Sequence, residues 1–239
     1  MSGTPRLTRD GLDEAVPVVA VLGSFAAAAW AVLAAGVMGH ASHDVLLGSG
    51  RVPRVDAVVA VLGTWQLMVV AMMLPPAIPA VVGRARRTRR WWATTSAMVA
   101  TTCVVWTGFA VAVLAADAVV HHLVAAWPWL ASREWLVTSA VLALAGTIHL
   151  LPIQRRALAA VRRTPLTSWR YAVTCLGSCA PLMLVMFAVG AESLVWMLTL
   201  AAVMTVERVT SFGARLAPSV GLALISLAIL ASFPTSEFL

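Results

Sequence analysis

Residues 65–79 read WQLMVVAMMLPPAIP, a stretch that lies within a long apolar run yet contains three methionines, three prolines, a tryptophan and a glutamine. At about 100° per residue, an α-helix places several of these side chains on one narrow stripe. The stripe holds Trp65, Met68, Met72, Pro76 and Pro79, and Met73 points about a quarter-turn away. Thioethers on a proline-interrupted helix are typical of a soft-metal site, and also of ordinary helix packing.

Apolar runs of this kind recur along the whole chain. Of its 239 residues, 61% are hydrophobic and 11% are charged, whereas a soluble domain carries about 25% charged residues. The mean hydropathy is +0.90. Runs of roughly 20 apolar residues are long enough to cross a bilayer as a helix, and their continuity argues against short alternating strands. The sequence therefore predicts an all-α, polytopic transmembrane helical bundle, forming a single domain over residues 1–239.

Seven spans are expected along the chain. They lie at about 16–38, 57–82, 94–118, 135–151, 169–189, 192–207 and 216–232. The fourth and sixth are short, so six spans with one re-entrant or tilted segment are the alternative. The longest polar segments between them are 39–55, the arginines after the second span, and 155–170.

The arginines predict the orientation and the partner. All 17 basic residues are arginine, and the formal net charge is +7. With a cytoplasmic N-terminus, only Arg51, Arg54 and Arg133 fall outside, which satisfies the positive-inside rule. Short arginine loops also suit anionic lipid headgroups. We therefore expect a multi-pass protein of the cell membrane whose partner is the lipid bilayer, with no nucleic acid bound.

The fifth span carries a second soft stripe. Cys175, Cys179, Met183 and Met186 stand at i, i+4, i+8 and i+11, within one helical face, and Pro181 interrupts that helix. Thiolate and thioether ligands favour Cu(I) over hard cations. If Met68 and Met72 lie opposite the two cysteines, up to four soft ligands meet between two kinked helices. Cysteine with Ser178 and Gly177 is equally typical of close helix packing.

Two histidine groups are expected on the outer side. His40 and His43 form a His-x-x-His-Asp cluster with Asp44 after the first span, with ligands suited to Cu(II) or zinc. Asp117 and His121, at i and i+4, share a face at the end of the third span. Together they could receive incoming metal, although histidines at a membrane edge are more often plain interfacial residues.

The remaining ionisable residues within the apolar runs are few. His149 precedes Pro152 and is expected to hydrogen-bond a neighbouring helix, or else to accompany the soft ligands. Glu207 is expected to pair with Arg208 or a basic loop, because an unpaired acid at that depth is costly. There is no nucleophile–base set, no phosphate-binding glycine loop and no paired carboxylate in mid-membrane, so an enzyme is not expected.

Several motifs in order resemble one bacterial family of predicted metal-binding, copper-chaperone-like integral membrane proteins. The motifs are Trp65-x-x-Met68-x-x-Ala71-Met72-Met73-Leu74-Pro75, Trp106-Thr107-Gly108-Phe109, Gly146 with Pro152 and Arg155-Arg156, Arg163-Thr164-Pro165-Leu166, Cys175-Leu176-Gly177-Ser178-Cys179 with Leu182-Met183, Trp196-Met197 and Glu207-Arg208. The resemblance covers most of residues 60–210. Ser178 replaces a cysteine of the family, and His149 stands where the family usually has glutamine.

The resemblance implies copper-linked membrane biology. The predicted ligands of Cu(I) are Met68, Met72, Met73, Cys175, Cys179 and Met183, with His40 and His43 as an optional outer site. No cofactor other than copper is expected. The alternative is a non-catalytic accessory subunit that packs against a larger membrane enzyme, which could itself depend on copper, or against further copies of the chain. An ion-coupled carrier is the weakest hypothesis, because the spans contain few ionisable groups.

Overall fold

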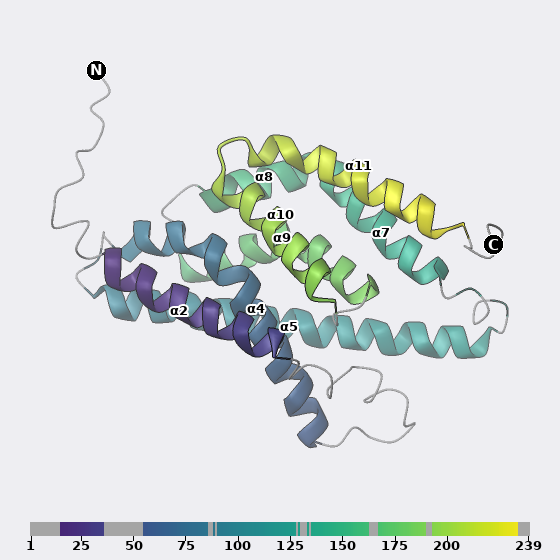
Figure 1. Cartoon of the computed structure of the whole chain (residues 1–239), viewed down its shortest axis with the longest axis horizontal. Coiled ribbons are helices and arrows are strands. Elements are labelled where there is room, and N and C mark those ends of the chain that lie inside the picture. Colours follow the sequence, from purple (N-terminus) through teal and green to yellow (C-terminus); the bar gives the residue numbers. More distant parts are fainter. Residues whose placement is uncertain are drawn as a thin grey trace.

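A computed structural model describes residues 15–35, 55–85, 88, 90–127, 129, 133, 135–162, 167–189 and 193–233. Within these residues all regular structure is helical (Figure 1). The helices are α2 (Ala15–Ala34), α4 (Val55–Ala85), α5 (Trp91–Ala126), α7 (Trp135–Leu150), α8 (Pro152–Arg162), α9 (Ser168–Val189), α10 (Leu194–Val209) and α11 (Gly213–Ala231). The prediction of an all-α helical bundle is confirmed.

Each of the seven expected spans lies on one helix, but not every helix is long enough to cross a membrane alone. Five helices are long and apolar enough, or six if the bent pair α7 and α8 counts as one span. The two short expected spans correspond to α7 and α10, with 16 residues each. A bilayer crossing needs about 20 residues. The count therefore agrees with the six-span alternative, whereas the orientation stays a prediction.

The segment expected as a polar loop after residue 155 contains a helix, α8. Pro152 has no backbone N–H, and α8 begins there at 67° to α7. Helix α8 buries Gln154, Leu158 and Val161 at i, i+4 and i+7, and it exposes Arg155 and Arg156. Such a helix has too little apolar length to resemble a span, although its apolar period is helical.

Helix α4 runs without interruption through Pro75, Pro76 and Pro79, which corrects the expectation of a broken helix. Pro75 cannot donate to the carbonyl of Ala71, four residues earlier. The indole Nε1 of Trp30 on α2 donates to that oxygen at 3.0 Å. Helix α2 therefore packs along α4 and satisfies the carbonyl that the proline leaves without a donor.

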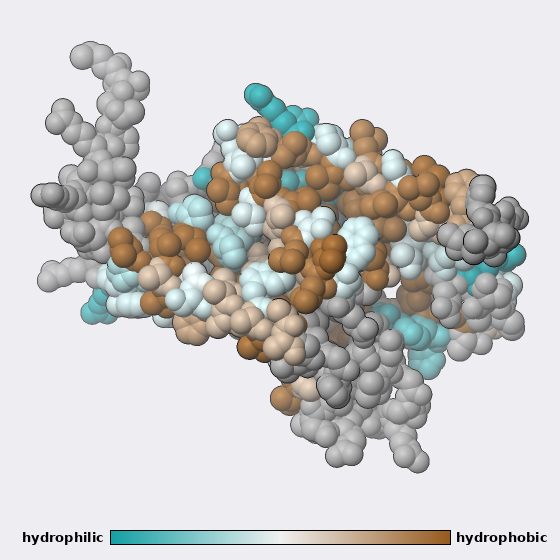
Figure 2. All heavy atoms as spheres, viewed as in Figure 1, coloured by the Kyte–Doolittle hydropathy of each residue, from teal (hydrophilic) through white to brown (hydrophobic). Residues whose placement is uncertain are grey.

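The helices form two groups that meet at α9 and α10. Helix α4 packs between α2 and α5, whereas α7 packs most closely on α11, and α5 and α10 join the groups by contacting α9 and α4 respectively. A Cβ at Gly146 would lie 2.7 Å from the carbonyl oxygen of Gly221, so this close crossing requires glycine. Figure 2 shows apolar side chains over much of one outer face, including α11, as lipid contact requires.

Candidate metal centre

The inner face of α9 carries the predicted soft stripe. Cys175, Cys179, Met183 and Met186 are all buried, and Tyr171 lies on the same face one turn before Cys175. The face also includes Pro181, which leaves the carbonyl of Gly177 without its helical donor. Helix α9 therefore presents two thiols and two thioethers to the interior of the bundle.

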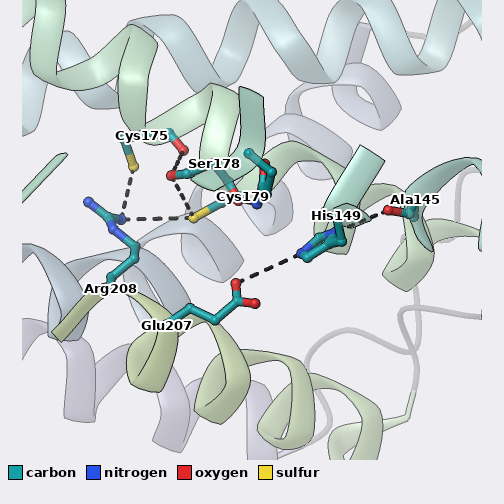
Figure 3. A network of polar contacts seen from close by, with 8 residues as sticks. Ala145, His149, Cys175, Ser178, Cys179, Glu207 and Arg208 are labelled. Atoms are coloured by element: carbon teal, nitrogen blue, oxygen red, sulfur yellow. Dashed lines mark hydrogen bonds and ion pairs between the residues drawn. The ribbon is translucent and has the colours of Figure 1, made fainter. Parts of the chain in front are cut away.

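Arg208 of α10 points directly at the two thiols (Figure 3). Its Nη1 lies 3.1 Å from Sγ of Cys175 and 3.9 Å from Sγ of Cys179, and its Nη2 donates to the hydroxyl of Tyr171 at 2.7 Å. Arg208 is 3% exposed. Because a guanidinium stays charged in a protein, it stabilises thiolate at the sulfur atoms it contacts. Two neighbouring thiols thus share one buried cation.

Hydrogen bonds from side chains to backbone carbonyls fix the turn between the cysteines. The hydroxyl of Ser178 donates to the carbonyl of Cys175 at 2.9 Å, and its oxygen lies 3.6 Å from Sγ of Cys179. The amide Nε2 of Gln154, on α8, donates to the carbonyl of Ser178 at 2.7 Å. Helix α8 therefore helps to hold the segment of α9 that carries the thiols.

An aromatic cluster connects the opening stretch of α4 with α9. The ring of Trp65 lies 5.1 Å from the ring of Phe187 on α9 and 6.2 Å from that of Trp106 on α5, measured between centroids. The indole Nε1 of Trp65 donates to the carbonyl of Trp106 at 3.0 Å. Trp65 is therefore the α4 side chain that joins the three helices at this level.

The methionines of α4 lie in the same interior but on a different helix interface. Met68, Met72 and Met73 are buried. Helices α4 and α9 do not pack closely along their backbones; α4 lies against α5 and α10, and α10 lies against α9. These thioethers are buried, as ligands inside the bundle must be. A ligand set that combines them with the thiols of α9 stays a prediction.

A second polar group adjoins the thiols. Nε2 of His149, on α7, lies 3.8 Å from Oε2 of Glu207, on α10, and Nδ1 of His149 lies 3.0 Å from the carbonyl oxygen of Ala145. Glu207 does not face Arg208 as expected, because consecutive helical residues diverge (Figure 3). His149 Nε2 and Glu207 Oε1 are buried without a hydrogen-bond partner in the described residues.

The outer histidines are only partly described. His40 and His43 lie outside the described residues. Asp117 and His121 lie on one face of α5 as predicted, with 3.5 Å between Oδ1 and Nδ1, and both are at least partly exposed. Among the described residues, no three His, Cys, Asp or Glu side chains are grouped to hold a metal ion. A metal site built from the described residues would therefore have at most two ligands of these four types, or would add methionine thioethers to them.

Sequence reasoning missed most of the groups that surround the thiols. Arg208, Tyr171 and Gln154 were not predicted to approach the cysteines. The sequence did contain one signal, the adjacent Glu207 and Arg208 in an apolar run. Charged residues at membrane depth are destabilising, so they usually belong to a functional site. The pairing across helices α9 and α10 depends on tertiary packing, which helical spacing alone does not give.

The fold and this centre define a class of protein, an all-helical protein with membrane-length helices and a buried pair of thiols beside a guanidinium. The chain belongs to the PpoB2 family, described as copper chaperones, whose match covers residues 62–231. The predicted resemblance is confirmed, and the description of the family suggests copper handling. No curated protein and no solved structure matches the chain.

Proposed function

We propose that the chain binds Cu(I) inside the membrane at Cys175 and Cys179 and carries it as cargo for transfer. The observation that supports the proposal is the shared contact of both sulfur atoms with Nη1 of Arg208, at 3.1 and 3.9 Å. Two thiols on successive turns of one helix, both 1% exposed, face the same side of the bundle. No catalytic step is part of this proposal.

The charges of the centre favour a monovalent soft ion. Two thiolates that bind one Cu(I) carry one net negative charge, and Arg208 neutralises it. In a lipid-surrounded interior an uncompensated charge is expensive, so this balance matters more than it would in water. Thiolates select Cu(I), whereas calcium and magnesium require several oxygen ligands. The side chains around Arg208 are a poor match for those hard cations.

The methionines provide a way to release the ion. All eight methionines of the described residues are buried, on α4, α5, α9 and α10. Met183 lies one turn beyond Cys179, and Met68, Met72 and Met73 line the neighbouring part of the interior. A thioether is neutral, so it binds Cu(I) without the charge attraction of a thiolate. We propose that these residues pass Cu(I) toward and away from the cysteine pair.

Copper stoichiometry of purified protein tests the site. After anaerobic incubation with a soluble Cu(I) complex and gel filtration, the wild type should retain copper. Cys175→Ser and Cys179→Ser should lose most of it, because each removes one charged ligand. Cys103→Ser is the matched control, since Cys103 lies on α5 and is only half-buried. Wild-type protein without copper, or equal retention in all three variants, would refute the proposal.

A second candidate function is that of an accessory subunit, and α5 favours it. Beyond Ala110, no described side chain of α5 is buried, and Val111, Val119 and Leu123 are more than half exposed. This half of α5 could pack against another membrane subunit, a further copy of the chain, or lipid alone. Purification in a mild detergent followed by native mass measurement separates these cases. A lipid-bearing monomer would exclude the accessory role.

A further inference from the structure

We propose that His149 and Glu207 form a proton-accepting pair that takes the proton displaced when Cu(I) binds the cysteines. This inference rests on the proposed copper site and adds a coupled second site to it. Both residues lie on helices other than α9, and among the described residues neither shares a hydrogen bond with a thiol. Their role is therefore to hold a proton and not to coordinate the metal.

The hydrogen bonding of His149 leaves one place for a proton. Nδ1 lies 3.0 Å from the carbonyl oxygen of Ala145, and because a carbonyl can only accept, Nδ1 carries a hydrogen. Neutral His149 then presents the lone pair of Nε2 to Oε2 of Glu207 at 3.8 Å. Two acceptors face each other across that distance. A proton on Nε2 turns them into a donor and a carboxylate, which attract.

Burial gives weight to the missing hydrogen-bond partners of His149 and Glu207. His149 is 0% exposed and Glu207 is 1% exposed, and neither Nε2 nor Oε1 has a hydrogen-bond partner in the described residues. Unpaired polar groups in a membrane interior are costly and often mark proton or ion pathways. Gly213 packs directly on the backbone of Glu207, since a Cβ at that position would lie 2.1 Å from the carbonyl oxygen of Glu207. The pair therefore lies in a closely packed interior, away from solvent.

The titratable and charged groups near the pair come from two helices, α9 and α10. Helix α10 contributes Arg208, and α9 contributes Tyr171 and the two thiols around it. Helix α8 contributes the neutral amide of Gln154, since Arg155 and Arg156 are exposed. The buried residues of α11 are Gly213, Ala217, Gly221, Leu224 and Ala228, none of which is ionisable.

The proposed step conserves atoms and charge. In the proposed copper-free state, Arg208 faces one thiolate and one thiol, His149 is neutral, and Glu207 is a carboxylate. When Cu(I) bonds to the second sulfur, the S–H bond of that cysteine breaks and its proton moves to Nε2 of His149. No electrons are transferred. The entering Cu(I) neutralises the remaining negative charge, and His149 becomes an imidazolium paired with Glu207.

Proton counting during copper binding tests the pair. Cu(I) is added anaerobically to weakly buffered protein in nanodiscs, and a pH indicator reports the protons released per copper bound. The wild type should release about one proton fewer per copper than Glu207→Gln or His149→Gln, because metal binding to thiols displaces protons that only the intact pair retains. Thr147→Val is the control, because Thr147 is an exposed, uncharged residue of α7 two positions before His149, and its loss should leave the count unchanged.

Infrared difference spectra of the wild type provide a second measurement that needs no variant. Copper addition should shift the carboxylate and imidazole bands as His149 becomes protonated. Equal proton release in wild type and Glu207→Gln, with no carboxylate shift, would overturn the inference while leaving the copper site intact. If the wild type binds no copper, the proposed function fails instead. In that case a pH titration followed in the infrared shows whether the pair binds a proton: a band change would retain the proton site, and no change would refute it.

Discussion

The α4–α5 region and the α7–α9–α10 region both bury polar groups, but with different consequences. Around α4, neutral donors satisfy two carbonyls, as Trp30 does for Ala71 and Trp65 does for Trp106. Within the described chain, the buried atoms there that have no hydrogen-bond partner include the neutral Gln66 Oε1, Thr95 Oγ1 and Trp106 Nε1. Around α9 and α10, the buried groups are ionisable, and several of their atoms have no partner among the described residues. A buried ionisable group costs more to leave unpaired than a neutral one, and it marks a functional site more often. The second region is therefore the stronger candidate for the functional site.

The largest effect should follow loss of the buried cation. Arg208→Met removes the partner of both thiols, and breaking one side of a buried charged pair costs about 3–5 kcal/mol. Cu(I) affinity, measured by competition with a chelator, should therefore fall on the order of 100-fold or more. Arg215→Met, at an exposed position of α11, is the control. Unchanged Cu(I) affinity in Arg208→Met would show that the buried charge beside α9 does not contribute to copper binding.

A medium effect is expected where α7 crosses α11. In Gly146→Ala the new Cβ would lie 2.7 Å from a backbone oxygen, which cannot yield as a flexible side chain would. Overpacking of this kind costs about 1–3 kcal/mol, and the variant should unfold at lower temperature in detergent. Gly108→Ala, where no atom lies within 4 Å, should unfold at the wild-type temperature or slightly higher. If both variants unfold at the same temperature, the crossing of α7 and α11 does not require glycine at position 146.

The smallest effect is expected in the α4–α5 region. Trp30→Phe keeps an aromatic ring but removes the donor to the carbonyl of Ala71, at a cost of about 1 kcal/mol. Thermal unfolding should show a modest loss of stability, while copper stoichiometry stays at the wild-type value. Trp92→Phe, on an exposed ring, is the matched control. A loss of copper in Trp30→Phe would show that the α4 region also contributes to the metal site.

The sequence predicted the helices well, because apolar length and the thiol spacing are local features. The burial of Cys175 and Cys179 on one face of α9 follows from helical period alone. The contact of those thiols with Arg208 depends on how α10 rotates against α9, and no local pattern encodes it. Glu207 shows the same limit, since adjacency to Arg208 in sequence suggested a pair that helical geometry separates. Helix α8 was missed because its apolar stripe is only three residues long.

Helix α5 is longer than the hydrocarbon layer of a bilayer is thick. Its 36 residues extend about 54 Å, whereas the hydrocarbon layer of a bilayer is about 30 Å thick. With Trp91 at one boundary, an upright α5 would hold Asp117 roughly 39 Å away. At a steep tilt of about 40°, Asp117 would still reach the opposite boundary. With Trp91 at one boundary, the paired Asp117 and His121 would therefore lie at or beyond the far surface, within reach of an ion that arrives from water.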